Sequence, residues 1–109
     1  MELKTAQSFG AKNATEEDIR TAFADDSRRG EFVIIEESDH AFMQAAGELD
    51  GPYSLEYREA EHQYYCDKKV SKAEVEAAFL KYLRHDHSYR SDFGWKKLDI
   101  SAKPWWKIW

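Results

Sequence analysis

The spacing of hydrophobic residues predicts an amphipathic helix in the second half of the chain, over Ser71–Arg84. Apolar residues recur there every three or four positions, which places them along one side of a helix. They are Val75, Ala78, Phe79, Tyr82 and Leu83. Ser71 and Glu74 have the spacing of a capping box, in which each side chain bonds a backbone N–H at the helix start. We therefore expect this helix to pack its apolar stripe into the core.

A weaker pattern predicts another helix over Thr15–Arg28. Thr15 can cap the helix, and the three acidic residues after it complement the positive end of the helix dipole. Ile19, Ala22 and Phe23 follow at helical spacing, and Gly30 stops the pattern. Residues 1–13 show no clear periodicity, so we expect them to be flexible or to form an edge strand.

Between the two helices the pattern is typical of short strands joined by turns. Phe32–Ile35 is continuous and β-branched, and Ala41–Ala46 follows after a connection too short for parallel pairing. From Tyr53 to Arg58 apolar and polar residues alternate, which predicts one face in the core and the other in water. His62–Cys66 is expected to be the fourth strand.

The last part of the chain is harder to assign, although Phe93 and Trp95 allow a fifth strand. The complete pattern predicts an α+β fold, with an antiparallel meander sheet of four to five strands and two amphipathic helices packed on it. A length of 109 residues suits a single domain over residues 1–109. Within it, residues 103–109 form a Trp-rich tail.

Composition narrows the classes of function. The formal net charge of -5 disfavours binding to nucleic acid and favours a basic protein partner. The single cysteine, Cys66, cannot form an internal disulfide, which favours a reducing compartment and a buried structural thiol. No apolar segment approaches the ~20 residues that span a bilayer. We expect an acidic cytoplasmic protein that does not bind membranes.

The histidines are the first candidates for catalytic or metal chemistry. His85 and His87 flank Asp86, but residues two apart on a helix point in different directions, and metal-binding pairs are usually four apart. The two histidines are better explained as positively charged side chains that suit the negative end of the second helix's dipole. His40 and His62 have no partner at a diagnostic spacing. The sequence therefore predicts no catalytic residue, no metal site and no cofactor.

Acidic residues near the predicted turns are candidates for a collective role. They would form a rim that attracts a basic partner. Solvated acidic residues are also common beside turns. The interpretation that these are surface residues without a binding role therefore stays open. The partner-binding residues we select from this region are Glu36, Glu37, Asp39, Glu56 and Arg58.

Three tryptophans near the C-terminus, Trp105, Trp106 and Trp109, need a separate explanation. A polar chain gains little by exposing them, so the tail either folds back onto the sheet or docks on another chain. Folding back is the favoured interpretation. We include the three residues among the candidate partner-binding residues because the second interpretation remains open.

The order of several segments resembles a known group of proteins. The segments are Phe32–Glu36, Phe42–Ala46, Tyr53–Arg58, Ser71 with Ala77–Leu83, and Phe93–Trp95. Together they are similar to the small bacterial immunity proteins of polymorphic-toxin systems and their uncharacterised relatives. The resemblance implies a non-enzymatic cytoplasmic protein that binds and blocks a toxin domain. It carries over no individual functional residue.

The leading hypothesis is therefore a protein-binding module of immunity type, either a monomer or a homodimer. One alternative is a small ligand-binding or metal-binding protein, or an enzyme, that uses His40, His62 or the pair His85 and His87. Another is a self-associating structural protein with the Trp-rich tail as its interface.

Overall fold

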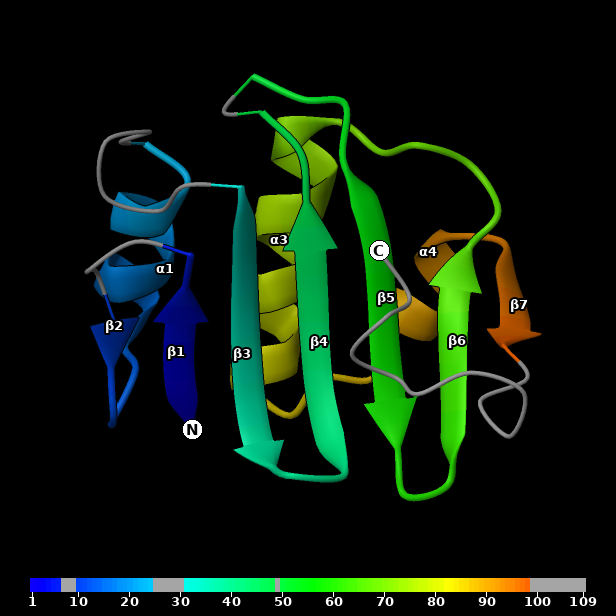
Figure 1. Cartoon of the computed structure of the whole chain (residues 1–109), viewed down its shortest axis with the longest axis horizontal. Coiled ribbons are helices and arrows are strands. Elements are labelled where there is room, and N and C mark those ends of the chain that lie inside the picture. Colours follow the sequence, from blue (N-terminus) through cyan, green and yellow to red (C-terminus); the bar gives the residue numbers. More distant parts are fainter. Residues whose placement is uncertain (7–9, 25–30, 49, 99–109) are drawn as a thin grey trace.

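A computed structural model describes residues 1–6, 10–24, 31–48 and 50–98 of the chain. These residues form a seven-stranded antiparallel sheet in the order β2-β1-β3-β4-β5-β6-β7 (Figure 1). The strands are β1 (Glu2–Thr5), β2 (Gly10–Ala11), β3 (Phe32–Ser38), β4 (Ala41–Ala46), β5 (Ser54–Glu59), β6 (His62–Cys66) and β7 (Trp95–Leu98). The predicted α+β class is confirmed, and the sheet is larger than the four or five strands predicted.

The four central strands, β3 to β6, form the predicted meander. Each is paired with the next in the chain, and β6 covers the same residues as the predicted fourth strand. β7 adds the late strand that Phe93 and Trp95 suggested, although it begins at Trp95. β1 and β2 are the two strands that periodicity did not predict. Of these two, β2 lies at an edge of the sheet and β1 lies between β2 and β3.

Three helices of the described residues lie on one face of this sheet, α1 (Glu16–Ala22), α3 (Lys72–Leu83) and α4 (Tyr89–Asp92) (Figure 1). The predicted capping box holds the start of α3, because Ser71 accepts from the Glu74 N–H and Glu74 accepts from the Ser71 N–H. Thr15 and Asp18 form the same arrangement at the start of α1. α1 is shorter than predicted, and residues 25–28 of that prediction lie outside the described part of the chain.

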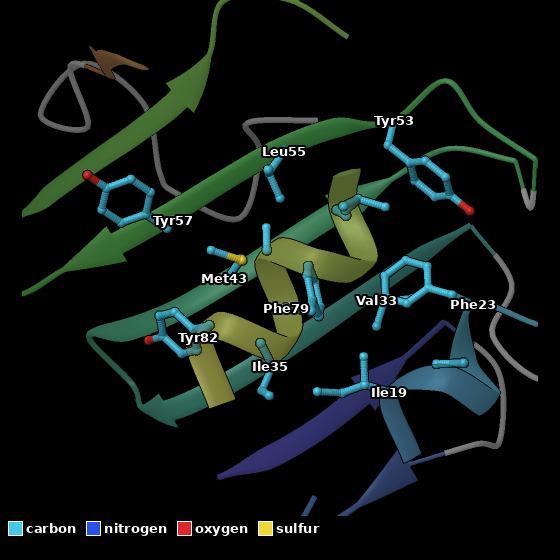
Figure 2. Close-up of a cluster of buried hydrophobic side chains, with 14 of the residues drawn as sticks. Ile19, Phe23, Val33, Ile35, Met43, Tyr53, Leu55, Tyr57, Phe79 and Tyr82 are labelled. Atoms are coloured by element: carbon cyan, nitrogen blue, oxygen red, sulfur yellow. The ribbon is translucent and has the colours of Figure 1, made fainter. Parts of the chain in front are cut away.

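The hydrophobic core lies between α1, α3 and the helix-covered face (Figure 2). The stripe of α3 is buried as predicted, apart from the half-buried Leu83, and Phe79 is fully inaccessible. Phe23 joins the two ends of this core, because its ring meets Phe79 and Tyr53 edge-on at 5.2 and 5.9 Å. Cys66 is half-buried at the margin of the core, so the prediction of a buried thiol was too strong.

The segment after α3 extends the core with aromatic side chains. Tyr57 stacks on Tyr64 with ring centres 5.0 Å apart, and Tyr89 and Trp95 meet the Tyr57 ring edge-on at 5.2 and 4.7 Å. The Trp95 indole N–H also donates to the Tyr89 carbonyl oxygen. These contacts hold α4 against the sheet beside β7, its edge strand.

On the opposite face of the sheet, here called the second face, the exposure of two residues differs from the prediction. Alternation along β5 placed Glu56 and Arg58 in water, but they are only 5% and 9% exposed. Polar groups can be buried at low cost when they bond one another. Gln44 of β4 and Gln63 of β6 lie directly beside these residues, and both amides donate to Glu56, at 2.7 and 3.3 Å. Gln44, Glu56 and Gln63 are called the polar cluster below.

Candidate functional site

Two hairpins end side by side at one end of the sheet. The β3–β4 connection follows Ser38, and the β5–β6 connection follows Glu59. Ala41, the first residue of β4, is opposite Ser38 on one side and Glu59 on the other. Figure 1 shows both connections at the lower end of the sheet. Residues from two separate turns are therefore neighbours.

These connections bring five carboxylates together, which we call the acidic end: Glu36, Glu37, Asp39, Glu59 and Glu61. Two of them are paired, because Lys4 lies 2.7 Å from Glu36 and Arg90 forms an ion pair with Glu59. The other three, Glu37, Asp39 and Glu61, are exposed. No cation of the described residues lies within ion-pair distance of these three.

The negative charges of the acidic end raise the pKa values of two nearby groups. The hydrogen bond from Lys4 to Glu36 raises the pKa of the Lys4 ammonium, although desolvation opposes it. Burial is the main cause of the raised pKa of the Tyr82 hydroxyl, and the charges of Glu37 and Glu36 add to it. The field at this end is therefore negative, which attracts a cationic group.

The predicted histidines do not form a metal site in the described part of the chain. His40 and His62 are both exposed at the acidic end. Among the described residues, no group of three or more histidine, cysteine, aspartate or glutamate side chains could hold a metal ion.

His85 and His87 lie just beyond α3. His85 has a positive φ of 59°, and the Asp86 carboxylate accepts from the Ser88 N–H, which lowers the Asp86 pKa. This turn ends the helix. Within this turn, the Asp86 carboxylate forms a hydrogen bond with the nearby Ser88 backbone N–H.

The candidate partner-binding residues separate into three groups. Glu36, Glu37 and Asp39 belong to the acidic end. Glu56 and Arg58 are buried on the second face, where the Arg58 Nε donates to the Ala60 carbonyl at 2.9 Å. Trp105, Trp106 and Trp109 lie outside the described residues. Of the described candidates, the structure thus brings only the first group together on one surface, where Glu37 and Asp39 are exposed and Glu36 is half-buried.

The sequence pattern counted Glu59 and Glu61 among the acidic residues near the predicted turns, but neither was selected as a partner-binding residue. Both were visible as acids near a turn, and the predicted meander already implied that alternate connections share one end of the sheet. Combining the strand order with the acidic turns would have selected them.

None of the helices that the structure describes combines the length and the apolar composition needed to cross a membrane. Comparisons of the chain with protein-family models, with curated proteins and with solved structures found no match.

Proposed function

We propose that this chain is a non-enzymatic protein-binding module, of the kind that blocks a toxin domain, and that its acidic end binds a basic surface of the partner. The observation that carries the proposal is the position of three exposed carboxylates, Glu37, Asp39 and Glu61, on two adjacent hairpin ends, where no cation of the described residues pairs with them.

The distribution of charge supports a directional interaction. The opposite end of the sheet carries both signs of charge, because Lys68, Lys69 and Lys72 lie there in and after the β6–α3 connection, with Glu48 and Asp50 in the β4–β5 connection (Figure 1). Like charges held together repel one another, and a cationic partner relieves that repulsion while steering the encounter. A basic surface would therefore approach the hairpin ends.

The rigidity of the acidic end also supports the proposal. Strand pairing continues to Ser38, Ala41, Glu59 and His62, so the carboxylates stand on ordered hairpins. A preformed surface loses little conformational entropy when a partner binds. The Arg90–Glu59 pair ties the same end to α4.

The test compares capture from a lysate of the native host by three forms of the chain. The first is unchanged, and the second carries Glu37→Gln, Asp39→Asn and Glu61→Gln. The third carries Glu17→Gln, Glu48→Gln and Asp50→Asn, which remove the same charge from exposed positions elsewhere. We expect a specific basic protein with the first and third forms, and a roughly tenfold or greater loss of association rate with the second.

Binding of the purified partner should also weaken as salt increases, because exposed charge pairs are screened. Equal binding by the second and third forms would refute the role of the acidic end. Recovery of no specific protein by any form would count against the binding function itself.

A further inference from the structure

β7 (Trp95–Leu98) forms one edge of the sheet, beside α4 (Figure 1). Its inner side is paired with β6 along all four residues, and no strand of the described residues pairs with its outer side. At the other edge of the sheet, β2 has only two residues. β7 is therefore the longer edge strand, and the outer side of an edge strand can pair with a strand from another chain.

The hydrogen-bond pattern shows which backbone groups of β7 point outwards. In an antiparallel pair, residues whose backbone groups face the partner alternate with residues whose groups face away. The Asp67 N–H donates to the Gly94 carbonyl at 3.0 Å, so Gly94 faces the β6 side. Trp95 and Lys97 then face away from β6. Within the described ranges, no backbone group bonds the N–H or the carbonyl of these two residues.

The side chains of β7 define which strand can fit beside it. Trp95 contacts the Tyr57 ring, so Trp95 and Lys97 lie on the helix-covered face, and Lys96 and Leu98 alternate onto the second face. Both lysines are exposed, whereas Trp95 and Leu98 are half-buried. No carboxylate in the described part of the chain forms an ion pair with either lysine.

The two lysines disfavour a second copy of β7 as the partner. Two β7 strands paired antiparallel and centred on Lys96 would place that lysine opposite its own copy, and the same holds for Lys97. Like charges that are directly opposite destabilise strand pairing. Exposed lysines on edge strands commonly prevent self-association in this way. A strand that brings carboxylates to the same positions has the opposite effect.

The order of the side chains specifies the partner more closely. Directly opposed residues share a face of the sheet, so apolar residues suit the positions opposite Trp95 and Leu98, and acidic residues suit those opposite Lys96 and Lys97. Phe93 extends the apolar side, because its half-buried ring meets Trp95 edge-on at 5.6 Å. The order apolar–acidic–acidic–apolar is the same in both directions and therefore suits parallel or antiparallel pairing.

We propose that the outer edge of β7 binds an extended acidic segment of another protein by strand addition, with carboxylates opposite Lys96 and Lys97. Main-chain hydrogen bonds to Trp95 and Lys97 supply affinity, and the cross-strand charge pairs supply specificity. This inference does not rest on the proposed function, because the acidic end attracts a cationic surface and includes no residue of β7. The chain thus carries two interaction surfaces that prefer opposite charges.

Nuclear magnetic resonance of the full-length chain tests the proposal with a capped peptide, threonine-valine-glutamate-glutamate-valine-threonine. We expect slowed solvent exchange of the Trp95 and Lys97 backbone N–H groups as the peptide is added. The N–H groups of Lys96 and Leu98, which face β6, are the internal control and should not change. A peptide with lysine in place of both glutamates should bind roughly fivefold or more weakly.

Variants of the chain separate the charge pairs from the main-chain bonds. Lys96→Glu with Lys97→Glu should reverse the preference, so that the lysine peptide binds better. The matched control, Lys12→Glu with Lys68→Glu, makes the same change of charge at exposed positions elsewhere and should keep the preference for the glutamate peptide. Lys97→Pro removes an outward N–H from an edge strand, so it should abolish binding without changing thermal unfolding.

Four results would overturn the proposal. The first is unchanged exchange at Trp95 and Lys97 with both peptides, and the second is equal affinity for the two peptides. The third is protection of these N–H groups without peptide that increases with protein concentration, which would show that a second copy pairs with β7. The fourth is loss of peptide binding when the carboxylates of Glu37, Asp39 and Glu61 are neutralised, which would place the peptide at the acidic end.

Discussion

The two faces of the sheet both carry buried residues but are stabilised by different interactions. The helix-covered face presents aliphatic and aromatic residues to α1 and α3, and Phe79 lies at its centre (Figure 2). The second face places an amide–carboxylate–amide cluster beside Phe42 and Arg58. On the first face, stability depends on the apolar area and volume that are buried. On the second, it depends on whether every polar group keeps its partner.

The largest expected effect is on the helix-covered face. Phe79→Ala should lower the free energy of unfolding by about 3–5 kcal/mol, because it removes a buried ring and leaves a cavity. Urea unfolding followed by circular dichroism measures the loss. Leu80→Ala, at a half-buried position on the same helix, is the matched control and should cost clearly less. Equal losses for the two variants would contradict the placement of the core.

An intermediate effect is expected on the second face. Glu56→Leu should cost about 2–3 kcal/mol, because it leaves the Gln44 and Gln63 amide groups without their shared acceptor. Glu56→Gln keeps one acceptor oxygen and should cost less. Adding Gln44→Leu to Glu56→Leu should recover part of the loss, since one orphaned donor is removed.

A double-mutant cycle on unfolding free energies measures that coupling between Gln44 and Glu56. Strict additivity of the two substitutions would show that the polar cluster does not act as a unit. The second face would then depend on buried volume, as the helix-covered face does.

The smallest effect concerns a polar atom within the apolar face. The Tyr89 hydroxyl is buried and has no hydrogen-bond partner in the described part of the chain. Tyr89→Phe should therefore leave stability near pH 7 unchanged or raise it by up to about 1 kcal/mol. Thermal unfolding measures the change. A loss of more than about 1 kcal/mol would mean that the hydroxyl is stabilised by a bond.

The same substitution has a predicted dependence on pH. Burial is the main cause that raises the pKa of Tyr89 from 10.0 to about 12. The folded state favours the neutral phenol. The contribution of this preference to the free energy of unfolding is therefore complete below pH 10.0 and is lost as the pH rises towards 12. At about pH 11 Tyr89→Phe should retain more stability than the unchanged chain. Identical alkaline transitions would contradict the pKa shift.

The sequence predicted the elements whose patterns are local. The capping box and apolar stripe identified α3, and the short turns identified β3 to β6 as a meander. β1 was left open between a flexible segment and an edge strand, because its four residues pair with β3, a strand far along the chain. Four residues are too few to show a period, and non-local pairing leaves no signature in composition.

The candidate site was predicted only in part for a related physical reason. Glu36, Glu37 and Asp39 were found because acids beside turns are usually exposed. Glu56 was assigned to the same surface because a charged residue in an alternating strand usually faces water. Its burial depends on two amides supplied by neighbouring strands, and this pairing follows from register, which residue type does not reveal.

The separation between β1 and its partner also has a consequence for the order of folding. Each hairpin of the β3–β6 meander closes through a short turn, so it loses little loop-closure entropy when it forms. Thr5 pairs with Val33 only after the intervening chain, including α1, has been brought back to the sheet. We expect the meander to nucleate the fold and β1 to dock later. Conservative substitutions in β4 and β5 should then slow folding, whereas those in β1 should mainly accelerate unfolding.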